Sequence, residues 1–259
     1  MTVVPVLLYH SVSDDPLPEI AEYNLTRQRF ADHVRVIRDS GRTPITFADW
    51  VGRMRAAAAD PADGISSPER VVVVTFDDGY DNNLSACALL GEHGIPSTVY
   101  VTTDYVGRSG FVDEAGLRDL AAIDGVTVGS HAVSHRRLDE LPASELGDEV
   151  RLSRTRLADV LGRPCETFAY PHGNHGARVR RAVQDAGYAS AAGVKNAYSH
   201  ERDDVYGVAR LMATRDWSAD QLERFLGNDR PLAPRREKLQ TKGYRAYRRV
   251  RKRLTEVTS

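Results

Sequence analysis

Two adjacent aspartates, Asp77 and Asp78, directly follow the apolar run VVVVTF at positions 71–76. Carboxylates this close repel each other, and the pKa of one of them rises unless a cation compensates. Asp and Gly are also favoured in ordinary turns after a strand, so these residues alone do not distinguish a turn from a charged site.

Two histidines offer ligands for such a cation. In the segment SHAVSH, His131 and His135 are four residues apart, and on a helical turn both imidazoles can reach one ion. An isolated pair of this kind is more often two surface histidines. With one carboxylate, however, the set becomes two His and one Asp, and three protein ligands with an open position are typical of a catalytic zinc site. One aspartate would then bind the metal, and its neighbour would stay ionised as a base beside a metal-bound water.

The elements that must position these residues alternate between apolar strands and amphipathic helices. The expected strands are 5–9, 44–46, 71–76, 97–102, 125–129, 166–170, 188–193 and 205–213. Helices separate most of them, which predicts an α/β fold with a parallel sheet covered by helices. About eight such units favour a (β/α) barrel over an open doubly wound sheet, and no Gly-rich nucleotide motif follows the first strand.

In a parallel barrel the carboxyl ends of all strands lie at one rim, where the loops build the active site. Polar residues that follow the expected strands would converge there, namely His10, Asp77, Asp78, Ser130, His131, His135 and His172, together with Arg210 from the last strand. Chance could place one or two of them at the rim. Four acidic or imidazole clusters on one rim favour a functional site.

Three segments resemble signature motifs of the polysaccharide deacetylases, also called NodB-homology or carbohydrate esterase family 4 proteins. They are TFDDGY at 75–80, GSHAVSHRRL at 129–138 and FAYPHG at 168–173, and the resemblance covers residues 3–227. The opening VPVLLYHSV is similar to the circularly permuted branch that includes the poly-N-acetylglucosamine deacetylases. The resemblance implies a distorted (β/α)7-8 barrel of the NodB-homology type and metal-dependent removal of N- or O-acetyl groups from sugars.

The resemblance also implies a role for each matched residue. Asp77 would be the general base, and His10 would be the general acid that protonates the leaving amine. Asp78, His131 and His135 would bind one divalent metal ion, with Zn²⁺ expected and Co²⁺, Mn²⁺ or Ni²⁺ as alternatives.

The third motif departs from the family pattern, Arg-x-Pro-aromatic-Gly, because positions 169–173 read AYPHG. The resemblance places Tyr170, Pro171 and His172 at the substrate and oxyanion wall, where the backbone N–H of His172 would help to hold the oxyanion. The arginine that orients the base is absent from this motif. We expect Arg210 to replace it, the alternative being a simple pair with a surface carboxylate. His172 in place of an aromatic residue either alters the acetyl pocket or is a neutral change.

The function that we expect is a metal-dependent hydrolase that removes N-acetyl groups from an N-acetylated sugar or polysaccharide. An O-acetyl carbohydrate esterase would share the tetrahedral intermediate, but an alkoxide needs protonation far less than an amine does, so His10 favours the amide. A non-catalytic sugar-binding module should have lost the base or a metal ligand, and none of these residues is missing.

No apolar run is long enough for a transmembrane helix, and the first residues lack the basic region of a signal peptide. Cys87 and Cys165 form neither a metal pair nor a disulfide framework, so we expect ordinary thiols and a cytoplasmic protein. We expect a monomer with a saccharide substrate and no nucleic-acid partner.

Charge is divided unevenly along the chain, whose net charge is −1. Residues 230–259 hold eleven Lys or Arg and two Glu, a net of +9, which leaves −10 on the rest. We therefore expect a catalytic domain at 1–229 and a basic amphipathic tail at 230–259. An apolar stripe at helical spacing within 244–254 suits an anionic membrane surface, which would place the protein at the inner face of the membrane. A solvated helix and a helix folded against the acidic domain are the alternatives.

Overall fold

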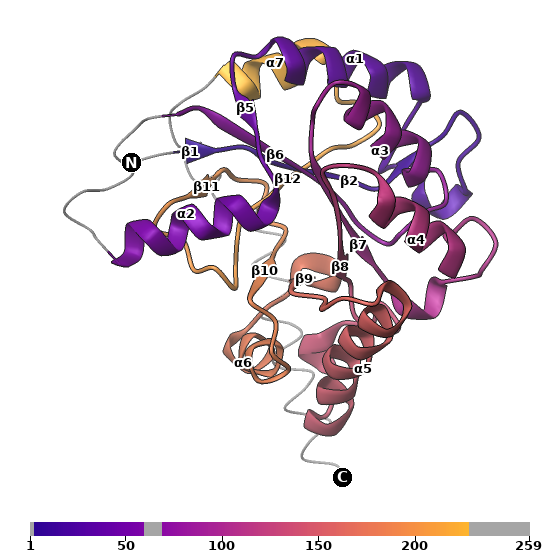
Figure 1. Cartoon of the computed structure of the whole chain (residues 1–259), viewed down its shortest axis with the longest axis vertical. Helices are drawn as coiled ribbons and strands as arrows, with labels where there is room; N and C mark the ends of the chain where they lie inside the picture. Colours follow the sequence, from indigo (N-terminus) through magenta and orange to yellow (C-terminus); the bar gives the residue numbers. More distant parts are fainter. Residues whose placement is uncertain (1–2, 60–68, 228–259) are drawn as a thin grey trace, which may run out of the picture. The chain divides into compact units, whose positions relative to one another are not determined.

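The computed structural model describes residues 3–59 and 69–227, and Figure 1 shows a curled sheet with helices around it. The main sheet runs in the spatial order β10-β9-β8-β7-β6-β2-β12, and every neighbouring pair is parallel. Its strands are β2 (Val6–Tyr9), β6 (Val71–Phe76), β7 (Ser97–Val101), β8 (Val126–Ser130), β9 (Thr167–Ala169), β10 (Ser190–Ala192) and β12 (Leu211–Met212), and β5 (Thr43–Pro44) pairs with β6. The predicted α/β class is confirmed as a parallel sheet curled into a half-barrel.

Helices follow most strands, as the periodicity predicts. They are α1 (Arg27–Asp39), α2 (Phe47–Ala59), α3 (Asn83–Glu92), α4 (Glu114–Ala122), α5 (Ala143–Leu161), α6 (Ala177–Asp185) and α7 (Ala219–Gly227). Two short pairs complete the described chain: β1 (Val3–Val4) is antiparallel to β11 (Ser199–His200), and β3 (Ser11–Val12) is parallel to β4 (Asn24–Leu25). No helix in the described ranges is long and apolar enough to cross a membrane.

The alternation of side chains along β6 determines which of them share a face of the sheet with Asp77. Successive side chains point to opposite faces of a sheet. Val71 and Val73 pack in one cluster with Trp50 of α2, on the inner face of the curled sheet. By the same alternation Thr75 and Asp77 continue this face, so α2 packs against the face of the sheet that carries the carboxylate.

The strand predicted over 205–213 is wrong in its extent. Val208 forms an isolated parallel bridge with Ala192 of β10, whereas Leu211 pairs with Leu7 of β2. The segment thus lies between β10 and β2, but only Leu211–Met212 forms a regular strand, and Val208 contributes a single bridge. Arg210 lies in this segment, immediately before β12.

His33 links α1 to the segment that precedes α7. It is fully buried, its Nδ1 lies 3.2 Å from the Tyr9 hydroxyl, and its Nε2 lies 3.1 Å from the carbonyl oxygen of Trp217. Because a carbonyl only accepts, Nε2 carries a hydrogen, and in the neutral ring Nδ1 accepts from the Tyr9 hydroxyl. Burial lowers the pKa of His33 from its ordinary 6.5 to about 4.

We predict that this residue makes the fold acid-sensitive. Between pH 6.5 and about 4 the unfolded chain takes up a proton that the folded His33 does not, so the free energy of unfolding falls as pH decreases through this window. The loss is on the order of 3 kcal/mol at most. Urea unfolding at pH 7 and pH 4.5 measures it, with His33→Gln as the comparison. The variant should be less stable at pH 7 but lose less on acidification; an equal loss in both proteins would contradict the assignment.

Candidate active site

The two aspartates occupy a sharp turn at the carboxyl end of β6. Asp77 continues the strand, and its N–H donates to the carbonyl of Tyr9 at 3.0 Å. Asp78 has φ 75° and Gly79 has φ 84°, in the left-handed region that is costly for any residue except glycine. At Gly79 a Cβ would lie 3.2 Å from the Val101 side chain, so a larger residue would also be crowded. The turn sends two neighbouring carboxylates into different surroundings.

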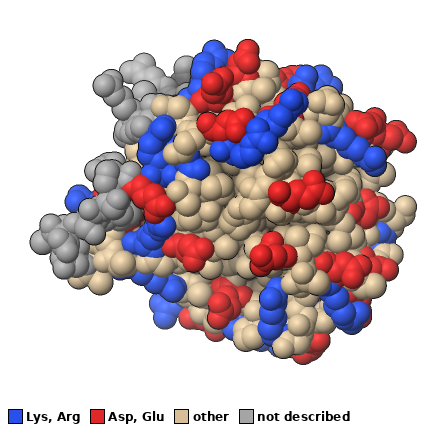
Figure 2. Space-filling view, turned by 45° about the horizontal axis from the view of Figure 1, so that its top comes forward, with Lys and Arg blue, Asp and Glu red and all other residues tan. Residues whose placement is uncertain are grey.

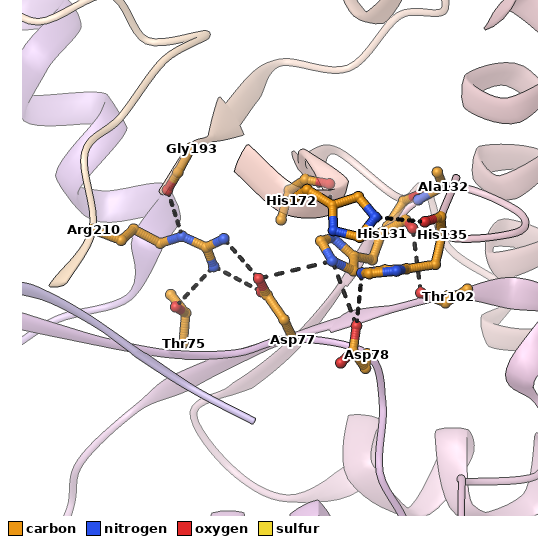
Figure 3. Close-up of polar contacts among 12 residues, drawn as sticks. Thr75, Asp77, Asp78, Thr102, His131, Ala132, His135, His172, Gly193 and Arg210 are labelled. Atoms are coloured by element: carbon orange, nitrogen blue, oxygen red, sulfur yellow. Dashed lines mark hydrogen bonds and ion pairs between the residues drawn. The ribbon is translucent and has the colours of Figure 1, made fainter. Parts of the chain in front are cut away.

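Arg210 holds Asp77 with two parallel hydrogen bonds, as Figure 3 shows. The Nη1···Oδ1 and Nη2···Oδ2 distances are 2.7 and 2.8 Å, and Arg210 and Asp77 are 0% and 2% exposed. Nη1 also donates to the Thr75 hydroxyl at 3.2 Å, and Nε donates to the carbonyl of Gly193 at 3.0 Å. The Tyr100 ring lies 5.5 Å from the guanidinium carbon. The geometry is bidentate and specific to arginine.

The surroundings separate the acidities of the two carboxyl groups. Burial alone would raise the pKa of Asp77, but the charge and hydrogen bonds of the Arg210 guanidinium outweigh burial and lower this pKa to about 2. Burial raises the pKa of Asp78 to about 6, and the neighbouring Asp77 charge adds to the rise. Asp77 is therefore firmly ionised, whereas Asp78 lacks a compensating cation of its own.

Asp78 faces two imidazole nitrogens. Its Oδ1 lies 3.3 Å from Nε2 of His135 and 3.6 Å from Nε2 of His131, and one ligand atom from each residue lies within 4.8 Å of the others. The predicted helical turn is wrong here: residues 131–137 form a loop in which Ala132 and His135 have positive φ values of 64° and 59°. The loop nevertheless brings both rings to the carboxylate.

These three residues fit a divalent cation. Oδ1 of Asp78 is buried and has no hydrogen-bond partner among the described residues. Nδ1 of His131 lies 2.8 Å from the carbonyl of Ala169, so Nδ1 carries the hydrogen and the lone pair of Nε2 points at Asp78. Burial lowers the pKa values of both His131 and His135, which keeps the rings in the neutral form that binds metals.

His10 reaches the same rim from the neighbouring strand. Tyr9 of β2 pairs with Phe76 of β6, so His10 and Asp77 lie level at the strand ends. The His10 carbonyl accepts from Nδ2 of Asn83 at 2.7 Å, and its ring lies 5.3 Å from the Tyr23 ring. Burial lowers the pKa of His10, although the charges of both aspartates oppose the change. Its buried Nδ1 has no hydrogen-bond partner in the described chain.

The third motif contributes a tight turn, η4 (Pro171–Gly173), in which His172 has φ 59°. The His172 ring lies 4.6 Å from the His135 ring. Burial lowers the pKa of His172, and His135 adds to the effect. Tyr170 is not brought into the polar group, because its side chain is buried and its hydroxyl donates to the carbonyl of Tyr206 at 2.9 Å.

Comparison with known proteins identifies the family. The polysaccharide deacetylase family model matches residues 64–191. The chain is 21% identical over 224 residues to the Bacillus subtilis (strain 168) protein YxkH, whose name assigns it to that family; the match covers 86% of this chain and 76% of YxkH. The chain belongs to the polysaccharide deacetylase family.

Solved structures of deacetylases share the fold. The Streptococcus pyogenes deacetylase PplD, solved in complex with acetate, superposes with a TM-score of 0.74 at 18% identity, over 86% of this chain and 98% of PplD. IcaB from Ammonifex degensii superposes with a TM-score of 0.71 at 23% identity, over 88% of this chain and 98% of IcaB. The half-barrel is thus the polysaccharide deacetylase fold.

The family pattern helps to interpret two positions of this deacetylase. Arg210 contacts Asp77 although the third motif has no arginine, as expected from the sequence; its role toward a base stays a prediction. Asp216 and Asp220 have the spacing of an Asp-x-x-Asp motif, but Asp216 is exposed and lies 3.6 Å from Arg215. The N–H of Gln221 donates to the Ser218 hydroxyl at 3.2 Å, which agrees with a helix cap in this stretch.

Sequence reasoning misses Glu149, a buried residue of α5 that fixes the loop between the two histidines. One carboxylate oxygen accepts from the N–H groups of Val133 and Ser134, both at 2.9 Å, and the other contacts the Ser134 hydroxyl. Glu149 precedes apolar Val150 on an amphipathic helix, and no motif marks it. Tyr80 is also missed, although it lies inside the first motif and its hydroxyl bonds to Asp78.

We predict one divalent ion per chain, which Asp78→Ala or His131→Ala should remove. Each change deletes one of the three candidate ligands found among the described residues. Elemental analysis of the purified proteins after dialysis measures the ion, and Asp216→Ala, an exposed carboxylate outside the ligand group, is the control. Full occupancy in both ligand variants would contradict the site.

Proposed function

We propose that this chain is a metal-dependent hydrolase that removes N-acetyl groups from an N-acetylated sugar or polysaccharide. The observation that carries the proposal is that the two adjacent aspartates have different partners. Asp77 is ionised and oriented by Arg210, while Oδ1 of Asp78 has no hydrogen-bond partner among the described residues and faces two neutral histidines. A hydrolase of this class needs one carboxylate as a base and another as a ligand.

Asp78, His131 and His135 would hold the ion. When bound, a divalent cation polarises the acetyl carbonyl and makes water a better nucleophile. Oδ2 of Asp77 lies 3.9 Å from Nε2 of His131, so the base adjoins the ligand group. Asp77 takes the proton of the attacking water, and Arg210 keeps the carboxylate facing that position. The backbone N–H of His172 donates to the oxygen on which negative charge develops.

His10 completes the reaction as the general acid. An amine is a poor leaving group unless it is protonated, and His10 lies level with Asp77 on the adjacent strand. The imidazole protonates the departing nitrogen, which leaves acetate and a free amino sugar as products. An O-acetyl esterase remains the alternative on the same residues, because an alcohol leaves with less need for an acid.

Acetate release tests the function directly. The chain, loaded with Zn²⁺, Co²⁺, Mn²⁺ or Ni²⁺ in turn, is incubated with N-acetylated oligosaccharides, nucleotide sugars and small N-acetyl glycosides, alongside O-acetylated sugars. We expect acetate from an N-acetyl substrate, and loss of that acetate after chelation that returns when metal is restored. Release only from O-acetyl sugars would favour the esterase, and binding without release would favour a sugar-binding module.

We predict that His10→Ala keeps its metal and its fold but loses about 10²- to 10⁴-fold in kcat on an N-acetyl substrate. The loss should shrink for an acetate ester with a good leaving group, because that group departs without a proton. Steady-state kinetics on both substrates measure the difference. His93→Ala, at the carboxyl end of α3 and therefore away from the strand ends that carry the site, is the control. Equal losses on amide and activated ester would show that His10 is structural or binds substrate.

We further propose that the basic segment 230–259 brings the enzyme to an anionic membrane surface, where lipid-linked saccharides would be accessible. The segment and the proposed domain boundary at 229/230 lie outside the described residues, so the support is the sequence: eleven basic residues and an apolar stripe at helical spacing. Figure 2 shows acidic and basic side chains interspersed on one face of the described domain, so that face supplies no continuous basic surface of its own.

We predict that the full chain co-sediments with vesicles that contain anionic lipid and that removal of residues 230–259 abolishes this binding. Each basic residue near such a surface contributes about 1 kcal/mol, and salt screens the attraction. Neutral vesicles and high salt are the controls. Equal, negligible sedimentation of both proteins with anionic vesicles would remove the membrane proposal.

A further inference from the structure

His172 lies beside the candidate metal group with its side chain exposed. The turn that carries it is unusual, because His172 and Gly173 have positive φ values of 59° and 72°. Gly173 cannot be enlarged, since a Cβ there would lie 2.7 Å from the Val194 side chain and 2.8 Å from its backbone nitrogen. A non-glycine residue in the left-handed region is strained, and such strain is concentrated at functional sites. The backbone thus holds this imidazole at one place on the rim.

One hydrogen bond determines which ring nitrogen can act on a ligand. Nε2 of His172 lies 3.2 Å from the carbonyl oxygen of His135. A carbonyl oxygen only accepts, so Nε2 carries the hydrogen, and Nδ1 of the neutral ring has a free lone pair. Figure 3 shows this second nitrogen turned away from the His135 carbonyl, toward the side of Asp77 in this view. An aromatic hydrocarbon ring at this position would offer no such acceptor.

We infer that His172 is a specificity-determining residue whose Nδ1 accepts a hydrogen bond from a donor on the saccharide close to the reacting acetyl group. The inference rests on the proposed deacetylase function, in which the acetyl group lies at Asp78, His131 and His135. Two donors fit this position, the N–H of the acetamide and a hydroxyl on an adjoining ring carbon. An ester lacks the N–H, so recognition of the amide would favour N-acetyl over O-acetyl substrates.

Three variants separate these possibilities. His172→Phe keeps a ring but removes the acceptor, whereas His172→Asn keeps an oxygen acceptor near the position of Nδ1. His93→Phe is the matched control away from the site. Each protein is assayed for kcat/KM on an N-acetyl sugar, the corresponding O-acetyl sugar, and N-acetyl analogues that lack one neighbouring hydroxyl. Metal affinity is titrated in parallel. If the His172 imidazole were itself a ligand, its removal would lower that affinity.

We expect His172→Phe to lose about 3- to 10-fold in kcat/KM, the usual worth of one neutral hydrogen bond, mainly through KM. His172→Asn should recover part of the loss, and metal affinity should stay unchanged. A loss confined to the N-acetyl sugar identifies the amide N–H as the donor. A loss shared by both sugars and absent for one deoxy analogue identifies that hydroxyl.

Unchanged kcat/KM on every substrate, or an equal loss on all of them including every deoxy analogue, would overturn the inference. So would a tenfold or larger fall in metal affinity, which would make His172 a ligand. If the wild-type protein releases no acetate at all, the proposed function fails separately. The acceptor is then tested by calorimetric binding of the N-acetyl sugar and its deoxy analogues, in which His172→Phe must still weaken binding of the sugar that carries the donor.

Discussion

The buried guanidinium of Arg210 gives the adjacent carboxyl groups of Asp77 and Asp78 different acidities. Arg210 binds both oxygens of Asp77 at 2.7 and 2.8 Å and leaves Asp78 without an arginine partner. The same ion pair explains why Asp77 stays ionised inside a protein, whereas burial raises the pKa of Asp78, which has no such partner, to about 6. Breaking a buried pair of this kind from one side typically costs about 3–5 kcal/mol, so the pair also ties the site to the stability of the fold.

The curled sheet makes this ion pair possible. Arg210 comes from the segment that passes from β10 to β2, and its Nε bonds to the carbonyl of Gly193, directly after β10. Its guanidinium therefore spans from one edge of the sheet to the Asp77 carboxylate at the end of β6. Arg210, Asp77 and the Tyr100 ring beneath the guanidinium are all buried. Burial strengthens the interaction between Arg210 and Asp77 and holds the carboxylate in one orientation.

The sequence was most informative where chemistry and strand ends coincide. Asp77, Asp78, His131 and His135 could be assigned because a parallel sheet brings the carboxyl ends of its strands to one rim. Arg210 could be suspected only because the third motif lacks an arginine, since no local pattern connects positions 77 and 210. Glu149 and the loop conformation of 131–137 escaped prediction, because side-chain bonds between a helix and a loop leave no periodic signal. The extent of the strand at 205–213 was wrong for a similar reason: apolar periodicity does not show that a segment changes partners.

The most direct measurement compares acetate release by the metal-loaded protein and its Asp77→Asn variant at matched metal content. The amide keeps the size of the carboxylate but cannot take a proton from water. The account predicts that the variant retains its ion and loses about 10²-fold or more in kcat on both amide and activated ester, because both reactions require the base. An Asp77→Asn protein that retains its ion and hydrolyses the N-acetyl substrate at the wild-type rate would contradict the assignment of Asp77 and the division of labour between the two aspartates.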